Sequence, residues 1–171
     1  MNTFSTQLNA LLILILSGII ISAFGVQIFL EEQPCPLCFL QRLGMTGVAI
    51  GAIMNLRFGI KTKHYAVSLL SCVFGGVVAL RQTALHICPG DPSFGEPILG
   101  LDLWVWSFLV FVCSITYIAF LLFLYDPEYA TQKTQKMNWF GKLAIWIFVL
   151  VTIGNILSVL HSCGLGPCSE F

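Results

Sequence analysis

Long runs of apolar residues alternate with short polar stretches along this sequence. A helix needs about 20 apolar residues to cross the roughly 30 Å hydrocarbon core of a bilayer, and five runs are long enough. They cover residues 9–30, 39–56, 65–85, 103–125 and 143–160. The pattern predicts an all-α integral membrane protein, with a four-helix transmembrane bundle and a fifth, C-terminal transmembrane helix.

The composition supports this class and excludes others. Of 171 residues, 57% are hydrophobic and 9% are charged, which is more apolar surface than a soluble domain of this size could bury. The formal net charge is zero, so no nucleic-acid partner is expected. The first run has no basic segment before it and no Ala-x-Ala site after it, which indicates a retained helix rather than a secretory signal. We expect one membrane domain over residues 1–171.

Basic residues favour one orientation, because short loops that carry Lys and Arg stay in the cytoplasm. The second and fourth connections contain six of them: Arg57, Lys61, Lys63, Lys133, Lys136 and Lys142. The opposite side has Arg42 and Arg81, both near helix ends, and most of the acidic residues. The N-terminus is therefore expected to be cytoplasmic and the C-terminus to lie on the outer side.

The seven cysteines divide according to this topology. Cys72 and Cys113 fall within apolar runs and are expected to be inert packing residues. The others lie at or beyond the outer face: Cys35, Cys38, Cys88, Cys163 and Cys168. An oxidising compartment would allow these five to form disulfides. Because five is odd, at least one is unpaired or pairs transiently.

The segment Cys35-Pro36-Leu37-Cys38 opens the second apolar run. Proline suits the first turn of a helix, so a helix is predicted to begin within the motif. Both sulfurs would then lie at the positive end of the helix dipole, which favours thiolates, and the two-residue spacer suits a reducible disulfide. The alternatives are a structural disulfide and a structural zinc site completed by Cys163 and Cys168.

Arg42 follows Cys38 by four residues, so it is expected on nearly the same helix face and one turn deeper. A guanidinium there could stabilise a thiolate and bind a carbonyl oxygen that gains negative charge. The alternative is an arginine that extends to the headgroups as an anchor.

These residues resemble the DsbB family of bacterial disulfide bond formation proteins. The resemblance rests on the run from Pro34 to Arg42 at the start of the second helix, and it covers about residues 10–125. Further matches are Ala79-Leu80-Arg81-Gln82, Cys88, Leu99-Gly100-Leu101 and Trp106.

The resemblance implies an activity and a place in the cell. Members of this family lie in the bacterial inner membrane, reoxidise the periplasmic thioredoxin-fold oxidant DsbA, and deliver its electrons to ubiquinone or menaquinone. It implies that Cys35 and Cys38 are the quinone-proximal pair, that Arg42 contacts the quinone, and that Cys88 forms the mixed disulfide with the partner. Arg81 matches a basic position of the family, and His86 is a further candidate contact.

Two features depart from the family. Its second outer loop usually carries two cysteines, but here Cys88 is alone, and a fifth helix and cysteine-containing tail occupy about residues 143–171. The favoured arrangement is a disulfide between Cys163 and Cys168, because closing a short loop costs little entropy. The alternatives are a bridge from Cys88 to one of them, or a tail disulfide without a part in turnover.

Two other functions remain open from the sequence. One is a quinone reductase of the vitamin K epoxide reductase type, whose Cys-x-x-Cys lies on a later helix. The other is a membrane scaffold with disulfide-braced outer loops. The sequence contains no nicotinamide or flavin fingerprint, and no metal is expected beyond the zinc alternative.

Overall fold

The computed structural model describes residues 2–29, 36–85, 99–125 and 137–163. Five helices account for most of this part of the chain: α1 (Asn2–Phe29), α2 (Pro36–Phe58), α3 (Thr62–Leu85), α4 (Leu103–Phe123) and α6 (Trp139–Cys163). Each of them is long and apolar enough to cross a membrane. The predicted fold class is confirmed, and the chain is a multi-pass membrane protein.

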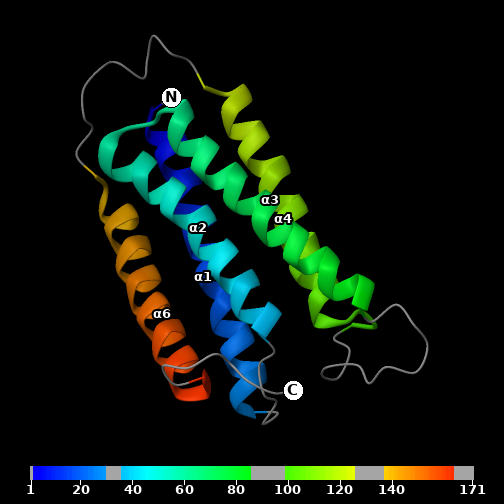
Figure 1. Ribbon diagram of the computed structural model, residues 1–171. Coiled ribbons are helices and arrows are strands. Elements are labelled where there is room, and N and C mark those ends of the chain that lie inside the picture. The colour runs from blue at the N-terminus through cyan, green and yellow to red at the C-terminus, as the bar shows by residue number, and fades with distance from the viewer. Residues whose placement is uncertain (1, 30–35, 86–98, 126–136, 164–171) are drawn as a thin grey trace.

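The helices lie side by side in a bundle, and their neighbours follow the order α6, α1, α2, α3 and α4 (Figure 1). Helix α1 packs against α2, α2 against α3, and α3 against α4, while α6 packs mainly against α1. The fifth helix therefore forms one edge of the bundle and α4 forms the other. The face of α2 that does not meet lipid is covered mainly by α1 and α3.

Local sequence signals explain where α2 begins and ends. The helix starts at Pro36, as the motif predicted, because the missing proline N–H has no partner in the first turn of a helix anyway. It ends at Phe58, directly before Gly59, whose φ of 83° lies in the left-handed region that favours glycine. The short turn 59–61 then leads directly into α3 and makes the two helices an antiparallel pair.

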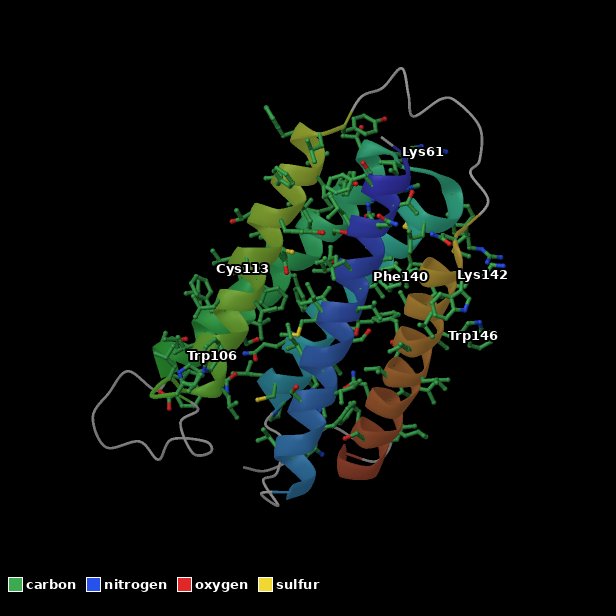
Figure 2. All side chains as sticks on the ribbon, turned by 180° about the vertical axis from the view of Figure 1, so that it is seen from behind. Lys61, Trp106, Cys113, Phe140, Lys142 and Trp146 are labelled. Carbon is green, nitrogen blue, oxygen red and sulfur yellow. The ribbon has the colours of Figure 1, made fainter. Side chains whose placement is uncertain are left out.

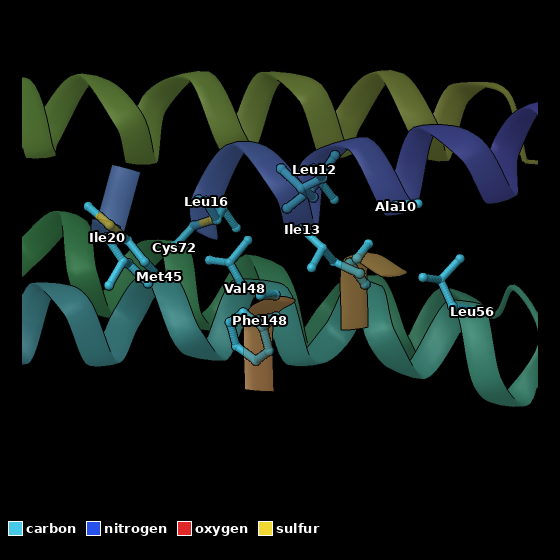
Figure 3. Packing of buried hydrophobic residues seen from close by; sticks show 14 of the residues in the cluster. Ala10, Leu12, Ile13, Leu16, Ile20, Met45, Val48, Leu56, Cys72 and Phe148 are labelled. Atoms are coloured by element: carbon cyan, nitrogen blue, oxygen red, sulfur yellow. The ribbon is translucent and has the colours of Figure 1, made fainter. Parts of the chain in front are cut away.

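Apolar side chains fill the centre of the bundle (Figure 3). Ile13 and Leu16 of α1 are at most 1% exposed. They belong to one cluster with Val48 of α2, Cys72 of α3 and Phe148 of α6. Since lipid tails are as apolar as these side chains, the cluster is held together by close packing rather than by transfer out of water.

Small residues bring α2 and α3 unusually close together. They are Gly44, Gly47 and Gly51 on α2, and Ser68, Ser71 and Gly75 on α3. A Cβ atom on Gly51 would collide with the Ser68 hydroxyl, which donates a 2.9 Å hydrogen bond to the Val48 carbonyl across the interface. A Cβ on Gly75 would project into the ring of Phe111 from α4. Glycine is thus required here for helix contact, as in many membrane interfaces.

A buried polar cluster joins α1, α2 and α3 next to the turn 59–61. The Asn9 amide donates to the Tyr65 hydroxyl at 3.0 Å, and the Asn55 amide donates to the Asn9 side-chain oxygen at 3.1 Å. The Asn55 oxygen accepts the Lys61 backbone N–H and lies 3.1 Å from His64 Nδ1. Polar groups without water must bond one another, so this cluster fixes three helices at one end of the bundle.

The cysteines within the helices have different environments. Cys72 is fully buried in the core, as expected of a packing residue. Cys113 of α4 (labelled in Figure 2) is exposed, so it is not the packing residue that was expected, whereas its expected inertness stays a prediction. This helix is apolar on all sides, so hydropathy alone did not reveal which side faces lipid.

The glycine interface predicts the effect of adding one methyl group. Gly75→Ala should lower the free energy of unfolding by about 1–3 kcal/mol, because the new Cβ overlaps the Phe111 ring in a packed interior. Thermal unfolding of the purified protein in detergent measures this. Gly18→Ala is the matched control, since nothing lies within 4 Å of a Cβ built on this α1 glycine. Equal stability of the two variants would contradict the proposed close contact.

Candidate functional site

The candidate site lies at the end of the bundle where α2 begins. Cys38 is the third residue of α2 and is half-buried. The N–H groups of a first helical turn point toward this end and attract negative charge, which favours a thiolate there. Cys35, the other half of the predicted pair, lies outside the described residues.

A glutamine on α3 contacts the Cys38 sulfur. Gln82 Nε2 lies 3.8 Å from Cys38 Sγ, and Gln82 Oε1 accepts a 2.7 Å hydrogen bond from Gln41 Nε2. The bond from Gln41 occupies the oxygen end of the Gln82 amide, so the nitrogen end is directed at the sulfur. Gln82 is 1% exposed and Gln41 is 5% exposed. A neutral donor in such a water-poor position stabilises negative charge on sulfur.

Arg42 is buried on the side of α2 that faces α1. Its side chain is 6% exposed. Nη1 donates to Gln27 Oε1 at 3.1 Å, and Nη2 donates to the Ala23 carbonyl at 3.3 Å. The guanidinium carbon also lies 5.0 Å from the ring centroid of Phe24 and 5.7 Å from that of Phe39. These contacts hold a cation within the bundle, close to two aromatic rings.

Gln27 also connects this arginine to the fifth helix. Its Nε2 donates to Ser158 Oγ at 3.2 Å, while its Oε1 accepts from Arg42. One glutamine of α1 therefore bridges α2 and α6. The contacts of Cys38 and Arg42 given above come from α1, α2 and α3, and α6 is connected to Arg42 through Gln27.

The sequence patterns assigned no role to Gln27, Gln82 or Ser158. A usable signal was present, because an amide side chain inside an apolar run is costly in a membrane and usually has a polar partner. The sequence could not give the partners. They depend on how each helix is rotated and on which helices are neighbours.

The other predicted site residues lie at the edge of the site or outside the described part. Arg81 precedes the inward-facing Gln82 and is exposed on α3. His86, Cys88 and Cys168 lie outside the described residues. Cys163 ends α6, but its side chain is also outside the described part.

These features define an α-helical membrane protein with a cysteine at a helix start and a buried arginine one turn deeper. The family model of the disulfide bond formation protein DsbB matches residues 5–96, which is more than half of the chain. The chain belongs to the DsbB family, as the residues around the Cys-x-x-Cys motif predicted.

Curated relatives carry the same family name, Disulfide bond formation protein B. The protein from Pseudomonas syringae pv. tomato is 42% identical over 95 residues, which are 50% of this chain and 55% of the relative. Those from Aromatoleum aromaticum and Xanthomonas axonopodis pv. citri are 38% and 32% identical over 80 and 107 residues. These cover 44% and 58% of this chain, and 47% and 62% of the relatives. The alignments thus span about half of each relative's length, and no solved structure matches the chain significantly.

The Gln82 contact predicts a change in the reactivity of Cys38. Gln82→Leu should slow alkylation of reduced Cys38 by roughly threefold to tenfold, because the thiolate loses a hydrogen-bond donor. Mass spectrometry of iodoacetamide-treated protein over time gives the rate at this residue. Thr83→Val is the control, since the Thr83 hydroxyl bonds the Ala79 carbonyl of its own helix. A Gln82→Leu rate equal to that of the wild type would show that the amide does not affect the thiol.

Proposed function

We propose that this chain is an oxidoreductase that oxidises a DsbA-like thioredoxin-fold dithiol protein and transfers the electrons to a membrane quinone. The observation that carries the proposal is the pair formed by Cys38 at the start of α2 and the buried Arg42 one turn deeper. Membership of the DsbB family supports the same chemistry. Oxidation of a dithiol to a disulfide releases two electrons and two protons, and the quinone, when bound, is the two-electron acceptor.

The residues around Arg42 suit a flat ring that bears carbonyl oxygens. The guanidinium offers N–H donors in one plane, and Phe24 and Phe39 supply apolar rings close to it. All three lie on helices that cross the membrane, which is where ubiquinone or menaquinone dissolves. We propose that Arg42 holds a quinone carbonyl, with Arg81 and His86 as further candidate contacts.

Cys35 and Cys38 are the proposed quinone-proximal pair. The helix dipole and the Gln82 amide both favour negative charge on the Cys38 sulfur, so they lower the cost of a thiolate in an apolar site. We assign the outer cysteines Cys88, Cys163 and Cys168 to the relay that receives electrons from the partner's dithiol.

The proposed location is the bacterial inner membrane, with a cytoplasmic N-terminus. The two labelled lysines in Figure 2, Lys61 and Lys142, lie at the end of the bundle opposite Trp106 and the start of α4. An excess of basic residues at this end favours the cytoplasm. Five crossings within one membrane domain of residues 1–171 then put the C-terminal tail in the periplasm.

This orientation has a direct test. After reduction, Cys163 and Cys168 should react with a membrane-impermeant maleimide added to intact spheroplasts, in a variant whose other cysteines are serine. Labelling that requires disruption of the membrane would reverse the proposed orientation.

Substitutions at Cys38 and at Arg42 should affect quinone reduction in two different ways. Cys38→Ser should abolish quinone reduction, whereas Arg42→His should mainly raise the KM for quinone, because a binding and charge-stabilising contact is lost. Purified protein with a reduced DsbA-type protein and ubiquinone-1, followed by quinone absorbance, measures both. An unchanged KM in Arg42→His would make Arg42 a structural anchor. If the wild type reduced no quinone, a disulfide-braced scaffold would be the better description.

The relay predicts a role for the tail. In our preferred arrangement Cys163 and Cys168 form the disulfide that the partner attacks, and Cys88 stays unpaired or joins transiently. The double variant Cys163→Ser, Cys168→Ser should therefore oxidise the partner at least tenfold more slowly than the wild type. Peptide mapping of the oxidised protein identifies the disulfides. A normal rate in the double variant together with a slow Cys88→Ser variant would exclude the tail from the relay.

A further inference from the structure

Helix α6 contacts the bundle through one narrow stripe. Its buried residues recur every three or four positions: Gly141, Ala144, Phe148, Val151 and Asn155. Residues of α6 outside this stripe, such as Trp146, Leu150 and Leu157, are at least 60% exposed and suit lipid. The stripe is apolar where the helix begins and becomes polar near its other end, at Asn155 and Ser158. That end lies beside the residues that surround Arg42.

Ser158 bonds the nitrogen end of the Gln27 amide, while the oxygen end faces the arginine. The short contact is a 3.2 Å bond from Gln27 Nε2 to Ser158 Oγ, and the reverse bond from Ser158 Oγ to Gln27 Oε1 is longer, at 3.5 Å. With its nitrogen directed at Ser158, Gln27 presents its oxygen to Arg42 Nη1 at 3.1 Å. The opposite orientation would bring an N–H donor against a guanidinium that can only donate.

A second contact from α6 supports the same arginine. Gly154 lies beside Phe24, because a Cβ built on this glycine would be 3.9 Å from Phe24 Cε2. The Phe24 ring in turn lies 5.0 Å from the guanidinium carbon of Arg42. Helix α6 therefore supports both an amide and an aromatic ring that contact the guanidinium.

We propose that Ser158 is a positioning residue for Arg42, acting through Gln27, and that α6 is thereby part of the quinone site. The inference rests on the proposed function for its ligand but on the contacts above for its geometry. Helix α6 lies beyond residues 5–96, which match the family model. An arginine side chain has many rotamers, and a partner that fixes its planar head lowers the cost of binding a carbonyl in one geometry.

Ser158→Ala tests the proposal without requiring turnover. The Kd of ubiquinone-1 for the oxidised protein in lipid nanodiscs, measured by titration calorimetry, should rise about fivefold, the factor expected for loss of one ordinary hydrogen bond. Ser158→Thr keeps the hydroxyl and should restore most of the affinity. Thr152→Ala is the matched control on α6, since the Thr152 hydroxyl bonds the Phe148 carbonyl of its own helix. In turnover assays, the KM for quinone should rise by the same factor, with a smaller change in kcat.

Coupling to Gln27 separates positioning from general loosening of α6. In a Gln27→Leu background, Ser158→Ala should produce no further increase in Kd, because the residue that transmits its effect is gone. A full fivefold increase in that background would overturn the proposal, as would an unchanged Kd in Ser158→Ala alone.

The two proposals can fail separately. If the wild type binds ubiquinone-1 and Ser158→Ala weakens binding, but a reduced DsbA-type protein drives no quinone reduction, the proposed function is wrong and the positioning role stands. Normal turnover with identical quinone affinity in Ser158→Ala and wild type would remove the positioning role alone. A wild type that binds no ubiquinone-1 would overturn both.

Discussion

The close approach of α2 and α3 is the constraint on which the site depends. Glycines on both helices let their backbones pack where any Cβ would collide, and Ser68 closes the gap with a hydrogen bond to the Val48 carbonyl. At this separation the Gln82 amide on α3 reaches the Cys38 sulfur on α2. Wider spacing would leave both the glutamine and the cysteine in an apolar medium with poorer partners, at a cost that lipid cannot offset.

The site is divided between the two neighbours of α2. Helix α3 contacts the sulfur, whereas α1 contacts the guanidinium through Ala23, Phe24 and Gln27. A single turn of α2 thus carries the thiol and the cation, and each has its own supporting helix. Neutral amides suit both halves of this site. An amide can hydrogen-bond a charged group inside a membrane without adding a second charge that would need its own partner.

Hydropathy predicted the five helices well because a crossing helix must be apolar over its whole length, and this leaves a long signal. The start of α2 at Pro36 was equally clear, since proline has a fixed place in a first turn. The partners of Arg42 and Cys38 could not be predicted. Helices that are apolar all round do not reveal their rotation, so the meeting of Gln27 with Ser158, and the outward direction of Cys113, become visible only in three dimensions.

The asparagine cluster at the far end of the bundle has a consequence for the depth of the site. Asn9 bonds Asn55 and Tyr65, so α1 cannot slide along its neighbours by one helical turn without breaking both bonds. Gln27 is 18 residues further along the same helix, a rise of about 27 Å. Because the helix is rigid, the register that the asparagine cluster fixes at one end of α1 is kept at the other end. The cluster therefore sets the depth at which Gln27 meets Arg42. The vertical alignment of the residues around Arg42 is thus determined at the opposite end of the bundle.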